Sequence, residues 1–323
     1  MIGVEKFKQI STDTLQFATL VVILAGLMGL GEALAPGFLR PEHVFSILED
    51  LSMLGVVSIA QTLVIMSGGI DISVGAIMYF SSSTAAILMN GERFYLPFFT
   101  CLILGAAIGA INGAGVAMLG IPPIVMTLAM MIILTGVVFL YTGGTPGGEA
   151  APLLRQMVVG KLGLIHGTTI IWIIVTILFV IILKKTTYGR KIQAIGSNPR
   201  AAYCSGINVK WITFTVYTLS GLLSALAGLL LLGYMRIPYF FYKGGLGTEF
   251  MLKSIAATVL GGTLFVGGKG GVERTFIGVV LLGMLFSILT MLGLPEVGKL
   301  IAQGVLIISI VAIYLRTRIT QRR

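Results

Sequence analysis

Residues 94–148 read FYLPFFTCLILGAAIGAINGAGVAMLGIPPIVMTLAMMIILTGVVFLYTGGTPGG and contain no Asp, Glu, Lys or Arg. A helix crosses a bilayer with about 20 mostly apolar residues, so this uncharged run is too long for one crossing. Gly120-Ile121-Pro122-Pro123 interrupts it, and proline cannot continue the interior of a helix. The stretch therefore predicts two consecutive membrane-spanning helices joined by a short turn.

Eight further uncharged stretches each predict one helix and bring the total to about ten. They are 14–31, 51–70, 72–91, 162–183, 211–235, 254–268, 275–295 and 300–315. Hydrophobic residues make up 56% of the 323 residues and charged residues 11%, too little polar surface for a soluble globule. We therefore expect an all-α polytopic membrane protein, with residues 1–323 forming a single transmembrane domain.

The positions of Lys and Arg predict how the helices are oriented. With a cytoplasmic N-terminus and alternating helices, 14 of the 22 basic residues lie on the cytoplasmic side. An even number of helices places both termini there, which the basic residues near each end support. A cytoplasmic loop is then expected at about 184–211 and an external loop at about 142–168. Orientation also explains the net charge of +10, so no nucleic-acid partner is expected.

Polar residues within or beside the apolar runs are candidates for a gate or a transport pathway. Asp71 lies in SGGIDISVG (67–75), where it either caps the next helix or forms a gate or ion site near the cytoplasmic face. Gln61 and Asn112 either face a translocation cavity or bridge helices. Glu249 is the other carboxylate that could serve a transport mechanism inside the membrane.

Glycine and serine recur at intervals typical of closely packed membrane helices. Gly105, Gly109 and Gly113 are four residues apart, and so are Ser220, Ser224 and Gly228. Glycines also cluster on both sides of 254–268, which indicates either flexible turns or a discontinuous or tilted helix lining a cavity.

The predicted cytoplasmic loop contains a compact helical stretch. Within 184–211, PRAAYC (199–204) begins with a proline suited to a first helical turn and is followed by Ser205-Gly206, a helix stop. Orientation alone requires charge but no capped helix. We therefore favour a docking surface for a soluble partner over a loop that only sets orientation.

Four stretches match, in order along the chain, patterns of one known family. They are 67–75, GRKIQAIGSNPRAAYCSGIN (189–208), LSGLLSALAG (219–228) and IAATVLGGTLFVGGKG (255–270). On these motifs the chain resembles the ten-helix permease subunits of bacterial ABC importers for ribose, other monosaccharides and autoinducer-2. One departure concerns the substrate: the family commonly has two acids as E-L-D where Met251-Leu252-Lys253 stands.

The resemblance implies a non-catalytic subunit in the bacterial inner membrane, surrounded by lipid. ATP and Mg would be bound by a separate cytoplasmic ABC ATPase and not by this chain. A periplasmic sugar-binding protein would deliver the solute, and a second permease copy or a sister permease would complete the pathway. The residues that couple to the ATPase would be Gly196, Asn198, Ala201, Ala202 and Gly206. The alternative is an ion- or proton-coupled secondary transporter that uses Asp71 or Glu249.

Overall fold

The computed structural model describes residues 2–145, 147–238, 247–263, 265–295, 297–305 and 308, and of residues 2–16 the helical backbone alone. Its elements are α1 (Ile2–Leu34), α2 (Pro41–Met66), α3 (Val74–Met89), α4 (Tyr95–Ala117), α5 (Pro123–Thr142), α6 (Pro152–Val159), β1 (Lys161–Leu162), β2 (Ile165–His166), α7 (Gly167–Lys185), α8 (Thr187–Ser197), α9 (Pro199–Cys204), α10 (Val209–Met235), α11 (Thr248–Leu260) and α12 (Val272–Met291). Residues 297–305 are also helical.

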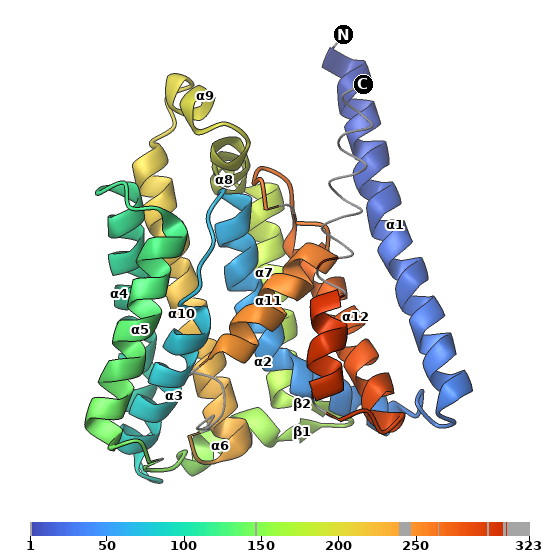
Figure 1. Ribbon diagram of the computed structural model, residues 1–323, viewed down its shortest axis with the longest axis vertical. Coiled ribbons are helices and arrows are strands. Elements are labelled where there is room, and N and C mark those ends of the chain that lie inside the picture. Colours follow the sequence, from blue (N-terminus) through green and yellow to red (C-terminus); the bar gives the residue numbers. More distant parts are fainter. Residues whose placement is uncertain are drawn as a thin grey trace.

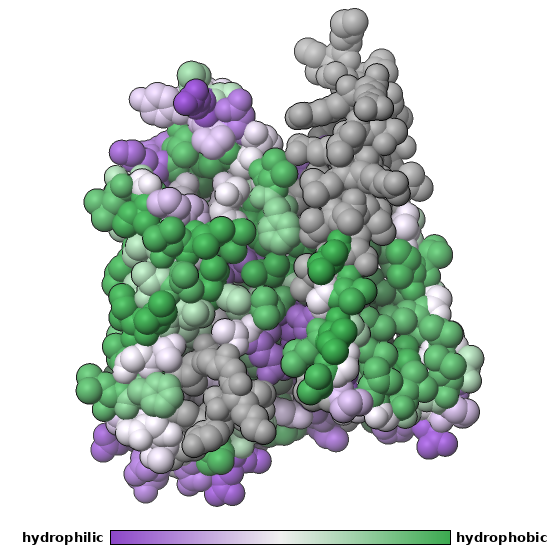
Figure 2. Space-filling model, viewed as in Figure 1, coloured by the Kyte–Doolittle hydropathy of each residue, from purple (hydrophilic) through white to green (hydrophobic). Residues whose placement is uncertain are grey.

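The helices form an upright bundle with two polar ends and an apolar belt. In Figure 1, α8, α9 and the beginning of α1 lie at one end, and α6, β1 and β2 lie at the other. Figure 2 shows hydrophobic residues between hydrophilic patches at the two ends. Within the described residues, seven helices are long and apolar enough to cross a membrane: α1, α2, α4, α5, α7, α10 and α12. The prediction of a polytopic, mainly helical membrane protein is confirmed.

The long uncharged run divides where its prolines predicted. Helix α4 ends at Ala117, and α5 begins at Pro123, which occupies the first turn. Proline is tolerated there because the first amides of a helix have no partner within it.

Two of the predicted spans are short helices that do not extend through the whole bundle. Helix α3 has 16 residues, and the segment 67–73 before it leaves the α8–α9 end and runs inward (Figure 1). Helix α11 has 13 residues, or about 20 Å at 1.5 Å per residue, and it is tilted. Gly75 in α3 touches Gly247 just before α11, so the beginnings of these two helices meet inside the protein. The tilt of α11 agrees with one of the two interpretations of the glycines, a discontinuous or tilted helix.

Close backbone packing holds α10 against α4, as the small residues predicted. A Cβ on Gly105 would lie 2.7 Å from the carbonyl oxygen of Gly221, and one on Gly113 equally close to that of Phe214. A Cβ on Gly109 would overlap the carbonyl oxygen of Tyr217. Two turns beyond Gly221 on α10, Gly228 lies against the backbone of Met78 in α3. Larger side chains at these positions would force the helices apart.

The predicted external loop contains structure that an all-α assignment omits. Between α5 and α7 lie α6 and an antiparallel hairpin, in which Lys161 pairs with His166 and Leu162 with Ile165. Leu154 and Val158 of α6 are buried. The predicted C-terminal helix is described only over part of its length. The arginines beyond this helix lie outside the described residues, and so do Gly244 and Gly245.

Candidate functional site

The segment between α7 and α10 forms two consecutive helices at one end of the bundle. In α8, Ile192 and Ile195 are buried, whereas Arg190 and Lys191 are exposed. A spacing of three residues between buried positions places them on one face of a helix. The hydroxyls of Tyr188 and Thr215 of α10 share a hydrogen bond of 2.9 Å. Burial raises the pKa of the Tyr188 phenol. Helix α8 is therefore fixed to the body of the protein, and sequence reasoning did not predict it.

The short helix α9 forms at the residues predicted for it. The side-chain oxygen of Asn198 accepts hydrogen bonds from the amides of Arg200 and Ala201, both at 3.1 Å. An asparagine before the first turn satisfies amides that have no partner within the helix. The chain then reverses at Gly206, whose φ of +80° is readily adopted by glycine.

The five predicted coupling residues occupy different environments within this segment. Asn198, Ala201 and Gly206 are exposed, while Ala202 and Gly196 are buried. Ala202 anchors α9 from beneath, and Gly196 lies against the carbonyl oxygen of Met66 at the end of α2. Tyr203 is 73% exposed beside them, although it was not among the predicted residues. The segment therefore presents a capped, rigid surface on a base that contacts the membrane helices.

Asp71 lies at the centre of a buried hydrogen-bond network. One carboxylate oxygen accepts from the amide of Ser73 at 2.9 Å and from its hydroxyl at 2.6 Å. The other accepts from the hydroxyl of Ser220 in α10 at 2.8 Å. The side-chain amide of Asn112 in α4 donates to the Ser73 hydroxyl at 2.9 Å. The network joins the segment before α3 to two long helices, and it brings Asp71 and Asn112 together.

The other two interior candidates lie outside this network. Gln61 is fully buried in α2, and among the described residues neither its amide nitrogen nor its oxygen has a hydrogen-bond partner. Glu249 forms an ion pair with Lys253 one turn later in α11. Lys253 also lies over the ring of Phe286 in α12, 5.3 Å from its centre. The single acid of this helix is therefore paired with a lysine of the same helix.

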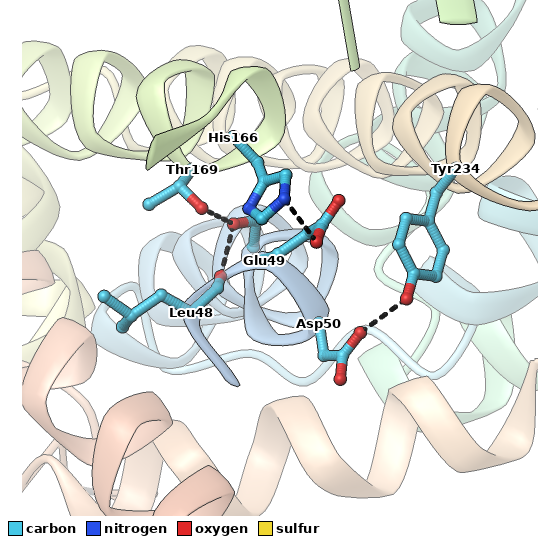
Figure 3. Close-up of polar contacts among 7 residues, drawn as sticks. Leu48, Glu49, Asp50, His166, Thr169 and Tyr234 are labelled. Carbon is cyan, nitrogen blue, oxygen red and sulfur yellow. Dashed lines mark hydrogen bonds and ion pairs between the residues drawn. The ribbon is translucent and has the colours of Figure 1, made fainter. Parts of the chain in front are cut away.

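A second polar cluster lies near the α6 end of the bundle, and sequence reasoning did not identify it (Figure 3). The Nε2 atom of His166 in β2 lies 3.1 Å from a carboxylate oxygen of Glu49 in α2, and both side chains are 10% exposed. The Tyr234 hydroxyl donates to Asp50 at 2.7 Å. Since Glu49 and His166 are 117 residues apart, no local motif could have predicted their contact.

Comparison with known proteins agrees with this architecture. The model of a family described as "Branched-chain amino acid transport system / permease component" matches residues 43–311. The ribose import permease protein RbsC of Escherichia coli is 36% identical over 301 residues, covering 91% of this chain and 92% of RbsC. RbsC of Bacillus subtilis is 35% identical, covering 85% of each chain. The fructose import permease protein FrcC of Rhizobium meliloti is 33% identical, covering 91% of this chain and 83% of FrcC. No solved structure matches.

These matches define the class as a transport permease, a membrane subunit that carries no catalytic site of its own. The chain belongs to the permease-component family matched over residues 43–311. It is a multi-pass permease subunit of an ABC importer in a bacterial inner membrane, and ATP hydrolysis takes place on a separate ATPase. The resemblance inferred from the four motifs is confirmed.

Proposed function

We propose that this permease imports a monosaccharide or a sugar-like polar solute. Its curated relatives include import permeases for ribose and for fructose, and alignment with them extends over most of this chain. A periplasmic binding protein would select and deliver the solute. A second permease copy or a sister permease would complete the pathway. The chain's own interior would then need to hold the solute only weakly.

The observation that carries the coupling role is the capped, exposed surface formed by α8 and α9. Asn198 caps α9, Ala202 anchors it, and Arg200, Ala201 and Tyr203 are exposed on it. A surface that receives force from another protein must keep its shape, and a cap contributes about 1 kcal/mol to that stability. We propose that this surface docks into the cytoplasmic ATPase, which binds ATP and Mg.

The same assignment sets the topology that we propose. The seven long helices, the shorter α3 and α11 and the helix that begins at 297 would make ten membrane segments. With the α8–α9 end in the cytoplasm, the beginning of α1 lies on that side, since both occupy one end of the bundle (Figure 1). An even number of segments would return the C-terminus to the same side.

The polar interior favours this function over an ion-coupled transporter. Both carboxylate oxygens of Asp71 already accept hydrogen bonds, and Glu249 is neutralised by Lys253. A coupling carboxylate has to bind and release an ion or a proton, whereas both of these are engaged in structural contacts. The ABC mechanism requires no such group in the permease.

The test is co-purification followed by a functional assay. The chain is co-expressed with the ATPase encoded beside it, solubilised in detergent and examined for co-elution and ATP hydrolysis. We expect a stable complex from the wild type and a weaker one from Arg200→Glu. A chain that elutes alone, with solute uptake that collapses with the ion gradient but persists without ATP, would refute the proposal.

A further inference from the structure

Three backbone segments meet in close contact below α9, at four glycines. Gly196 lies near the end of α8, Gly68 follows α2, and Gly267 and Gly268 lie between α11 and α12. A Cβ on Gly267 would lie 2.8 Å from the Gly196 oxygen and 2.9 Å from the Gly68 Cα. A Cβ on Gly196 would overlap the Met66 carbonyl oxygen. We call these four glycines, with that carbonyl, the glycine junction.

A hydrogen bond joins two of the three segments. The amide of Gly268 donates to the carbonyl oxygen of Met66 at 2.9 Å. Gly68, Gly267 and Gly268 have φ values of +89°, +83° and +75°, which side-chain-bearing residues rarely adopt. The close contacts leave no room for a Cβ at Gly196, Gly267 or Gly268. The backbone conformation favours glycine at Gly68, Gly267 and Gly268.

The junction connects the surface segment to both short helices. Residues 67–73 lead from Met66 to the beginning of α3, and residues 261–271 follow the end of α11. The opposite end of α11 meets the beginning of α3 at Gly75 and Gly247, inside the protein. The two short helices therefore contact each other at their beginnings, and the segments 67–73 and 261–271 connect both of them to the junction. A displacement at the junction thus acts on α3 and α11 together.

A force applied to α9 would act directly on the glycine junction, because the end of α8 is part of it. Gly196 lies two residues before Asn198, which caps α9, whereas the first turn of α8 is held to α10 through Tyr188. Movement imposed on α9 is therefore greatest at the junction end of α8. Long side chains can absorb small displacements by changing rotamer, but backbones in van der Waals contact must move together.

We infer that the glycine junction transmits movement of α8 and α9 to the segments that carry α3 and α11. This inference rests on the proposed docking of α9 into an ATPase and assigns to Gly196 the role of a positioning residue. Elsewhere, as between Gly105 and Gly221, glycines pack one long helix against another. At the junction they join the end of α8 to the end of α2 and to the loop between α11 and α12.

Hydrogen–deuterium exchange on the complex of permease and ATPase tests the inference. Exchange is measured without nucleotide and with a non-hydrolysable ATP analogue. In the wild type we expect the analogue to change exchange in 187–204 and, together with it, in 66–73 and 265–271. A change confined to 187–204 would overturn the inference. This comparison needs no variant.

The variant Gly267→Ala then separates transmission from assembly, because Gly267 is not among the predicted coupling residues. The added methyl would lie 2.8 Å from the Gly196 oxygen and 2.9 Å from the Gly68 Cα, so the segments must part and the Gly268 amide should exchange up to about tenfold faster than in the wild type. The complex and its ATP hydrolysis should persist, while the response of 66–73 and 265–271 to the analogue is lost. An undiminished response in this variant would refute the inference and leave the proposed function intact.

The matched control is Gly293→Ala after α12, where φ is also positive, at +76°, and an added Cβ has no atom within 4 Å. It should respond to the analogue as the wild type does. A wild-type chain that forms no complex with an ATPase would instead refute the proposed function, so the two failures are distinguishable.

Discussion

Removal of the Asp71 carboxylate should loosen the segment that leads into α3. The substitution Asp71→Ala removes the acceptor of three buried hydrogen bonds, two from Ser73 and one from Ser220. Hydrogen bonds between membrane helices contribute on average about 0.6 kcal/mol, and bonds to charged groups about 1.5 kcal/mol or more. Three bonds then contribute about 2–5 kcal/mol, and the thermal midpoint should fall by about 4–10 °C.

The chain's two cysteines provide the assay. Cys101 is buried and Cys204 exposed, so a Cys204→Ser background leaves one thiol that reacts with a fluorogenic dye only when the protein unfolds. In this background Ser220→Ala, which removes one of the three bonds, should lower the midpoint by about a third as much. The exposed Glu92 supplies a control, since Glu92→Ala should leave the midpoint unchanged. If Asp71→Ala melted within experimental error of the background, the carboxylate would not hold this segment in place.

Three further substitutions test other parts of the structure. Gly109→Leu places a side chain where even a Cβ overlaps backbone, so it should abolish a monodisperse size-exclusion peak that Gly136→Leu retains. Asn198→Ala should reduce the free energy of binding to the ATPase by about 1 kcal/mol, seen as weaker co-elution. Asn198→Asp should preserve both the cap and the affinity. Glu49→Gln removes the negative charge from a buried pair and should lower the thermal midpoint by an amount equivalent to about 1–3 kcal/mol. Full additivity with His166→Gln would show that the pair contributes nothing.

Sequence patterns predicted those features whose causes are local. The break at Pro122 and Pro123 follows from the missing amide of proline, and the helix 199–204 follows from its capping residues. The close contact of α4 with α10 was also predictable in kind, because glycines four residues apart leave a groove along one helix face.

Features that depend on distant partners could not be read from the sequence. Residues 51–70 were expected to form one helix, yet α2 begins at Pro41 and includes Glu49 and Asp50. These acids are accommodated because His166 and Tyr234, far away in sequence, contact them. An uncharged run indicates which residues can cross the membrane without polar partners. Tertiary contacts determine where the helix begins and ends.

The hydrogen bonds of Asp71 also explain why a carboxylate lies there without a basic partner. Among the described residues Asp71 forms no ion pair, yet it bonds the amide of Ser73 at the beginning of α3. The N-terminus of a helix carries roughly half a positive charge, and the beginning of α11 meets that of α3 at Gly247. The partial positive charge at the beginning of α3 thus lies beside one carboxylate. The acid complements a helix that begins inside the protein, a structural role that requires neither a bound ion nor a transported proton.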